Sequence, residues 1–181
     1  MALTTQQREN IQIDYGIIYL DYGETTQQLL GPTRGGGTFK VTKNIRDIDY
    51  DGRPGKTKRA QVVDEINASL TVTHLDTSID TLGLAIPFAI KSENKLICSK
   101  ASMGILPDAA YMKNVTMFAK TVGGKYKKIT LYNAMNESDL ELAAVPKGEG
   151  TVGLEIFAHW DSEDDEQALY EIEDVNTIAG T

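Results

Sequence analysis

Alternation of apolar and polar residues is the feature that most constrains the fold of this chain. Over residues 152–160 every second position is apolar, at Val152, Leu154, Ile156, Ala158 and Trp160. A period of two predicts a β-strand with one buried face, because successive side chains of a strand point to opposite sides. The same period predicts strands over residues 11–20, 39–45, 61–75, 111–122 and 126–135. Shorter strands are expected at residues 95–98, 140–142 and 169–172.

Only one segment has the period of an α-helix. Its apolar residues are spaced by four, three and four positions, at Leu75, Ile79, Leu82 and Ile86. Asp76 or Thr77 is expected to cap its start, and Pro87 prevents its continuation. One helix among roughly eight strands predicts a mainly β fold, an antiparallel β-sandwich or barrel flanked by one α-helix. A parallel βαβ arrangement is disfavoured because the crossover helices that it needs are missing.

The length of 181 residues suits one domain with tails. We expect an N-terminal arm over residues 1–10, a β-sandwich domain over residues 11–160 with a projecting loop at 40–59, and an acidic C-terminal arm over residues 161–181. A single cysteine, Cys98, cannot form an internal disulfide. We expect neither a signal peptide nor a membrane anchor, because no basic segment precedes an apolar run and no apolar stretch is long enough to span.

The net charge of −8 is unevenly distributed along the chain. From Asp161 onward there are eight acidic residues and no Lys or Arg, whereas residues 40–59 hold seven basic and three acidic groups. A second basic cluster without acidic neighbours in sequence comprises Lys113, Lys120, Lys125, Lys127 and Lys128. Such a chain can bind itself head to tail. The alternative interpretation is a solvated charged surface that maintains solubility.

Residues 40–59 are charged and interrupted by Gly52, Pro54 and Gly55, which makes them poor core material. Loops of this kind project from the body of a protein and contact something else. We expect the contacts to be with other copies of this chain. The expected contact residues are Arg46, Arg53, Lys56, Lys58 and Arg59 in the loop, and Asp161, Glu163, Asp164 and Asp165 in the acidic segment.

Motifs for bound phosphate are incomplete. Gly55-Lys56-Thr57 imitates the end of a P-loop, but Tyr50 occupies the position of the first glycine and a strand rather than a helix follows. We therefore expect no nucleotide site. Residues 35–37 are three glycines that lead into a strand, so they are interpreted as positions of positive φ or of close backbone approach.

Candidate catalytic and metal-binding residues lack partners at suitable spacing. His74 and His159 have no second His or Cys at zinc-ligand spacing, and Cys98 is expected to be a buried, inert thiol. The alternating acids Asp47, Asp49 and Asp51 lack the other ligands of a calcium loop and are interpreted as turn formers or partners for Arg46 and Arg53. We therefore expect no metal, no cofactor and no enzymatic activity.

Two alternative functions remain open. The first is a nucleic-acid-binding β-domain that uses the basic clusters at 40–59 and 113–128, although only Tyr111 and Tyr126 supply aromatic rings near the second cluster. The second is a small hydrolase with a site around Cys98 and His74.

Several phrases of the sequence resemble the major tail protein, or tail tube protein, of long-tailed, siphophage-type bacteriophages. The matching phrases lie at residues 16–19, 30–39, 45–52, 68–72, 114–116, 127–134 and 150–155. The resemblance covers about residues 11–160, and its motifs are structural rather than catalytic. A related contractile inner tube or secreted tube shares the fold and stays open.

The resemblance implies a role in the virion. It implies hexameric rings that stack into a tail tube around a tape-measure protein, with a tail terminator and baseplate or tip proteins as further partners. Double-stranded DNA would pass through the lumen without specific binding, and the protein would be made in the host bacterial cytoplasm. Family members often use terminal arms and a long loop between early strands for contacts between rings. Residues 40–59 are this loop by position.

Overall fold

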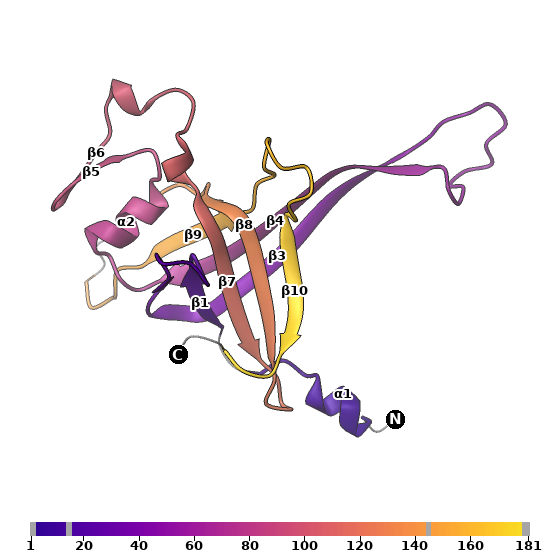
Figure 1. Cartoon of the computed structure of the whole chain (residues 1–181), viewed down its shortest axis with the longest axis horizontal. Helices are drawn as coiled ribbons and strands as arrows, with labels where there is room; N and C mark the ends of the chain where they lie inside the picture. Colours follow the sequence, from indigo (N-terminus) through magenta and orange to yellow (C-terminus); the bar gives the residue numbers. More distant parts are fainter. Residues whose placement is uncertain (1–2, 14–15, 144–145, 179–181) are drawn as a thin grey trace.

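The computed structural model describes residues 3–13, 16–143 and 146–178, and antiparallel strands dominate it (Figure 1). In those residues the strands are β1 (Ile17–Leu20), β2 (Gln28–Leu29), β3 (Thr33–Asp47), β4 (Gln61–His74), β5 (Ile90–Ser92), β6 (Lys95–Ile97), β7 (Met112–Lys120), β8 (Tyr126–Asn136), β9 (Val152–Phe157) and β10 (Tyr170–Val175). The helices are α1 (Thr5–Glu9) and α2 (Ile79–Ala85), with short 3-10 turns η1 (Lys100–Ser102) and η2 (Asp108–Ala110). The prediction of a mainly β, antiparallel fold with one main helix is confirmed.

The main sheet has the strand order β2-β1-β7-β8-β9-β4-β3, with β10 also paired to β8. Strand β8 connects the two halves of this sheet. Over residues 126–131 it pairs with β10, and at its end Met135 and Asn136 pair with Phe157 and Ile156 of β9. The sheet therefore folds over on itself, so that β3, β4 and β9 form one layer and β1, β7, β8 and β10 the other.

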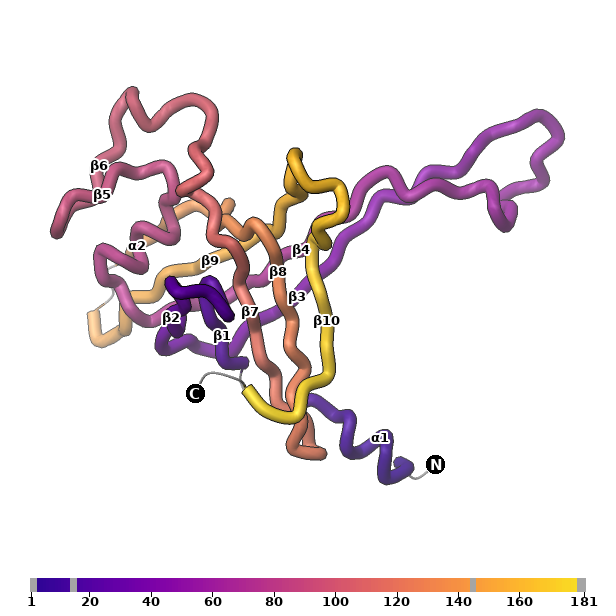
Figure 2. The backbone as a smooth tube through the Cα atoms, viewed as in Figure 1, coloured from indigo at the N-terminus to yellow at the C-terminus, as the bar shows by residue number. Residues whose placement is uncertain are grey.

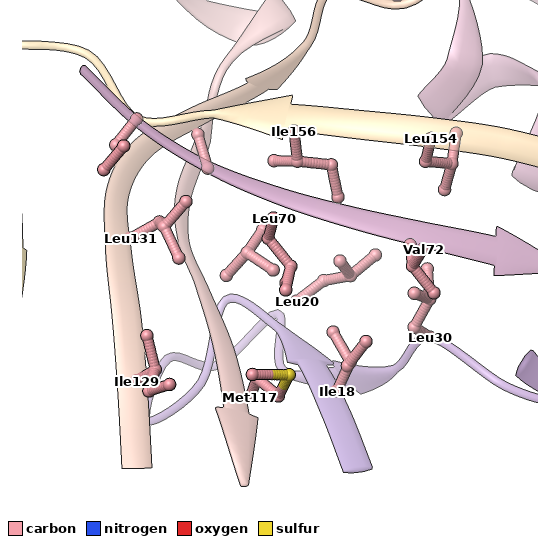
Figure 3. Packing of buried hydrophobic residues seen from close by; sticks show 14 of the residues in the cluster. Ile18, Leu20, Leu30, Leu70, Val72, Met117, Ile129, Leu131, Leu154 and Ile156 are labelled. Carbon is pink, nitrogen blue, oxygen red and sulfur yellow. The ribbon is translucent and has the colours of Figure 1, made fainter. Parts of the chain in front are cut away.

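The core lies between these two layers (Figure 3). The buried residues of β4 and β9 include Leu70, Val72, Leu154 and Ile156, and those of the facing strands include Ile18, Leu20, Met117 and Leu131. Each of them is at most 2% exposed. They occupy alternate positions along their strands, as the period of two predicts. Trp160 departs from the predicted pattern and is 60% exposed, because β9 ends at Phe157.

The three glycines of residues 35–37 lie in β3, where the register shifts, rather than in a free turn. Gly35 and Gly36 have φ values of 78° and 72°, a conformation that side-chain-bearing residues rarely adopt. A Cβ on Gly37 would lie 2.9 Å from Met117 Sδ and 3.2 Å from Leu70 Cδ1. Positive φ and close backbone approach, the two interpretations made from the sequence, therefore both occur here.

Replacing Gly37 by Ala is expected to destabilise the body, because the added methyl group would have no space between the two layers. The expected loss is about 1–3 kcal/mol of unfolding free energy, the usual range for overpacking a filled core. Urea unfolding would measure it. Gly153→Ala on β9 is the matched control, since a Cβ there meets no atom within 4 Å. Equal stability of the two variants would contradict the close approach at Gly37.

Ser78 is the N-cap of helix α2, so the prediction of Asp76 or Thr77 as the cap is wrong. The Ser78 hydroxyl accepts a hydrogen bond from the Thr81 N–H at 3.4 Å. Asp76 supports this cap, because its carboxylate accepts bonds from the Ser78 N–H at 2.9 Å and the Ser78 hydroxyl at 2.8 Å. Hydrogen bonds from Ser78 lower the pKa of Asp76 below its ordinary value.

Other elements also differ from the predictions. No strand forms at residues 140–142, although Leu140 packs against the core. Residues 5–9 form the helix α1, capped by Thr4, within the segment that was predicted to be an N-terminal arm. The strand predicted over residues 11–20 begins only at Ile17, and Asp14 and Tyr15 lie outside the described residues, as do 1–2 and 179–181 of the two predicted arms.

Candidate functional site: the projecting hairpin

Strands β3 and β4 form a hairpin that extends far beyond the body of the protein (Figures 1 and 2). Pairing of β4 with β9 spans Ser69–His74, and before Ser69 its only ladder partner in the described part of the chain is β3. None of residues 44–65 is buried. A two-stranded ribbon is at best marginally stable in water by itself. The outer part of this hairpin therefore has the properties of a segment that gains its cover from another molecule.

Apolar side chains on the hairpin are exposed to solvent. Six of them are between 37% and 52% exposed, namely Val41, Ile45, Ile48, Tyr50, Val62 and Val63. Single exposed apolar residues are normal on protein surfaces, but six along one ribbon are a concentration that favours protein contact. The long, straight edge of β3 also exposes backbone groups that can pair with a further strand.

Arg53 holds the tip of the hairpin in one conformation. Its guanidinium donates hydrogen bonds to Asp47 at 2.7 Å, Asp49 at 2.5 Å, and the carbonyl oxygens of Ile48 and Gly55 at 3.2 Å and 2.5 Å. The side chain is only 13% exposed, which is low for a loop residue. Arg53 was grouped with the contact residues, but these bonds give it an internal role as a clamp of the loop.

Asp47 is the acceptor at the base of this clamp. Its carboxylate also accepts a hydrogen bond from the Gln61 side chain at 2.9 Å, and the bonds from Gln61 and Arg53 lower its pKa. The interpretation of Asp47 and Asp49 as partners of Arg53 is therefore confirmed. Arg46 does not use these acids. It pairs across the ladder with Asp64 at 3.0 Å.

The remaining cations of the tip are free for an external partner. Lys56, Lys58 and Arg59 are exposed and have no hydrogen-bond or ion-pair partner within the described residues. The backbone of Arg59 has a φ of 70°. Thr57, which lies between Lys56 and Lys58, donates a hydrogen bond from its hydroxyl to the Gly55 carbonyl at 3.1 Å. Three positive charges therefore stand together at the end of a ribbon.

The acidic residues named from the sequence lie in the loop between β9 and β10. Asp161 and Asp164 use one carboxylate oxygen each to accept the N–H groups of Glu163 and Glu166, at 2.8 Å and 3.0 Å. Asp165 and Glu163 have exposed side chains. Among the described residues no ion pair joins these acids to Lys56, Lys58 or Arg59. The acidic and basic sets are therefore separate surfaces of one chain.

The second basic cluster is largely neutralised within the chain. The ion pairs are Lys113–Glu24 at 2.7 Å, Lys127–Asp174 at 2.5 Å and Lys128–Glu173 at 2.8 Å. Two of these acids belong to β10, which lies in the segment predicted to be a C-terminal arm and pairs with β8 in the main sheet. The hydrogen bond from Glu173 raises the pKa of Lys128. This neutralisation weighs against a nucleic-acid surface at residues 113–128.

Cys98 and His74 do not form a catalytic pair. Cys98 is exposed, so the prediction of a buried thiol is wrong. His74 is buried, and both of its ring nitrogens are used by the fold: Nδ1 accepts the Asp76 N–H at 3.0 Å and Nε2 donates to the Leu30 carbonyl. Across the described chain no group of three or more His, Cys, Asp or Glu residues could hold a metal ion.

Comparison with known proteins gives a likeness in structure but none in sequence. The sequence matches no protein-family model and no curated protein. Among solved structures, the chain is similar to one described as the virion of a native gene transfer agent particle, with a TM-score of 0.46 and 10% sequence identity over 88% of this chain and 96% of that chain. In residues 3–13, 16–143 and 146–178 no helix is both long and apolar enough to cross a membrane. We infer function from the hairpin and its charges.

Proposed function

We propose that this chain is a structural virion protein that assembles with copies of itself into stacked rings, forming the tail tube of a phage. The projecting hairpin carries this proposal. It presents exposed apolar residues and three unpaired cations, and no described part of its own chain covers them. An isolated ribbon of this kind is unfavourable for a protein that works as a monomer, and favourable for one whose neighbours bury it.

A heterologous contact would support stacking. We expect the hairpin of one copy to meet a different surface of the next copy without reciprocal exchange, so that the contact is heterologous rather than two-fold. Heterologous contacts produce rings when they close and open stacks when they do not. Six subunits per ring, a tape-measure protein in the lumen, and terminator and baseplate or tip proteins at the ends follow from the resemblance in sequence. The same resemblance implies that the protein is made in a host bacterial cytoplasm and that double-stranded DNA passes through the lumen without specific binding.

Negative-stain electron microscopy of the purified protein at high concentration tests the proposal. We expect rings or tubes from the wild-type chain. Reversal of the three free cations, in Lys56→Glu/Lys58→Glu/Arg59→Glu, is expected to block tube growth because it removes the attraction at the tip. The matched control is Lys95→Glu/Lys100→Glu/Lys125→Glu, which changes the net charge equally at exposed lysines of the body.

Each outcome has a clear meaning. A wild-type chain that stays monomeric at all accessible concentrations would overturn the proposal of self-assembly. If the tip variant forms normal tubes, the protein still self-assembles, but the charged tip is not needed for assembly. A filter-binding assay with single- and double-stranded DNA tests the alternative function, a nucleic-acid-binding domain. We expect the protein to retain neither form of DNA at physiological salt.

A further inference from the structure

A groove of about 530 Å³ lies beside the loop that follows β9. Its walls include Leu106, Asp108, Tyr111, Trp160, Asp161 and Glu163. These residues come from two distant parts of the sequence, the segment before β7 and the β9–β10 loop. The groove joins an exposed aromatic ring to several carboxylates. That combination suits a segment that carries both cations and apolar groups.

The aromatic side of the groove is well defined. Trp160 is the only tryptophan of the sequence, and its position in the β9–β10 loop leaves its indole available. The Tyr111 ring packs edge-on against the His159 ring, with centroids 5.1 Å apart. His159 is in turn fixed by hydrogen bonds of 2.8 Å to the Asn133 carbonyl and to Glu137. The Tyr111 wall is therefore held in place, while Trp160 offers a free face to a guanidinium or an ammonium group.

The charges of the groove are predominantly negative. Asp108, Asp161 and Glu163 contribute three carboxylates, none of which is ion-paired to a described residue. The one basic lining residue, Lys113, is paired with Glu24 at 2.7 Å. An unbalanced group of carboxylates beside an aromatic ring attracts a cationic partner and fixes its orientation.

The hairpin tip has the complementary chemistry. Lys56, Lys58 and Arg59 supply three unpaired cations, and Ile48 and Tyr50 supply exposed apolar surface beside them. The tip points away from the β9–β10 loop of its own chain (Figure 1), so it can reach such a groove only on another copy. The Arg53 clamp fixes the shape of the tip before contact, which lowers the entropy lost on docking.

We infer that the groove beside Trp160 receives the hairpin tip of a second copy of this chain, with Lys56, Lys58 and Arg59 opposite Asp108, Asp161 and Glu163 and a cation on the Trp160 ring. This inference rests on the proposed self-assembly and names the surface that the hairpin contacts. It differs from the sequence-based grouping of acids, because it includes Asp108 and leaves out Asp164 and Asp165, which do not line the groove.

A charge exchange between two variants tests the inference. One variant is the tip reversal Lys56→Glu/Lys58→Glu/Arg59→Glu, and the other is the groove reversal Asp108→Lys/Asp161→Lys/Glu163→Lys. Each alone is expected to assemble about 100-fold less well than the wild type, since like charges meet at every contact. Mixed in equal amounts, the two variants restore assembly, because the acidic tip fits the basic groove and the native tip fits the native groove. Sedimentation velocity and electron microscopy measure this.

Controls separate the groove from general effects of charge. Glu93→Lys/Asp139→Lys/Glu141→Lys changes the net charge equally at exposed acids outside the groove and is expected to assemble normally. Thermal unfolding of every variant confirms that the body is folded. Fluorescence of Trp160, the only tryptophan, is expected to change on assembly of the wild type and to stay unchanged in the tip variant alone.

The results distinguish this inference from the proposed function. If the tip variant fails to assemble while the folded groove variant assembles like the wild type, the hairpin docks elsewhere and self-assembly stands. If each variant fails and their mixture also fails, the two surfaces do not face one another and the inference is overturned. If the wild-type chain does not assemble, the proposed function and this inference fall together.

Discussion

Removal of residues 44–65 is expected to abolish self-assembly and leave the body folded. Lys43 and Ile66 are partners across the β3–β4 ladder, so an Asn-Gly pair between them can form a two-residue hairpin turn. No removed residue is buried. The segment contains five basic and five acidic residues, so the net charge of the chain stays at −8. Any change in assembly is therefore due to the hairpin surface and not to a change in net charge.

The expected loss is large because the removed segment carries most of the free contact surface. Ile45, Ile48, Tyr50, Val62 and Val63 all lie in it, and each apolar side chain contributes about 1 kcal/mol or more when it becomes buried. We expect the concentration needed for assembly to rise by about 1000-fold or more. The unfolding free energy of the body is expected to change by less than about 1 kcal/mol. Sedimentation velocity measures the first quantity and urea unfolding the second.

Two results would contradict this prediction. A shortened chain that assembles at the wild-type concentration would show that the hairpin is dispensable. A shortened chain that no longer folds would show that residues 44–65 stabilise the body, contrary to their exposure.

Strand positions were largely predictable because burial of one face repeats every second residue. In β9, Val152, Leu154 and Ile156 are buried as the alternation indicates. The end of the strand was not predictable, since alternation continues to Trp160 while the ladder stops at Phe157. Residues 140–142 alternate too, yet no neighbouring strand pairs with them. Ladder partners, which a local pattern does not contain, decide where strands begin and end.

The candidate site shows the same division between local and distant information. The basic, glycine-broken segment was recognisable from composition, although its first part, up to Asp47, belongs to strand β3 and not to a loop. The pairing of Lys127 and Lys128 with Asp174 and Glu173 was not, because these acids lie far away in sequence and reach β8 only when β10 joins the sheet. Exposure of Cys98 likewise depends on which elements pack over its segment. The chemical character of a short segment could be predicted from the sequence. The ion pairs that neutralise a surface could not, because they join residues that are far apart in the sequence.

Asn136 is a further residue whose role the sequence did not indicate. It ends β8, is 3% exposed, and uses its whole side-chain amide. Nδ2 donates to the carbonyl oxygens of Ala85 at 3.0 Å and Ser138 at 3.1 Å. Oδ1 accepts from the Glu155 N–H at 2.8 Å and the Ser138 hydroxyl at 2.9 Å. One side chain thus connects the end of β8 to helix α2 and strand β9.

Asn136→Ala is expected to lower the unfolding free energy by about 3 kcal/mol, because it removes four hydrogen bonds at about 0.5–1.5 kcal/mol each, one of them to the buried carbonyl of Ala85. Asn136→Asp should be no better, since a carboxylate cannot donate to Ala85 and Ser138 and would place charge beside their carbonyl oxygens.

Asn67→Ala is the matched control: its exposed amide bonds only to Glu65 at 2.8 Å, so we expect a change below about 0.5 kcal/mol. Urea unfolding compares the three variants, and similar stability of Asn136→Ala and Asn67→Ala would refute the connecting role. Because Asn136 lies in the body and not on the hairpin, the folded fraction of Asn136→Ala should still assemble at the wild-type concentration, which separates the stability of the subunit from the contact between subunits.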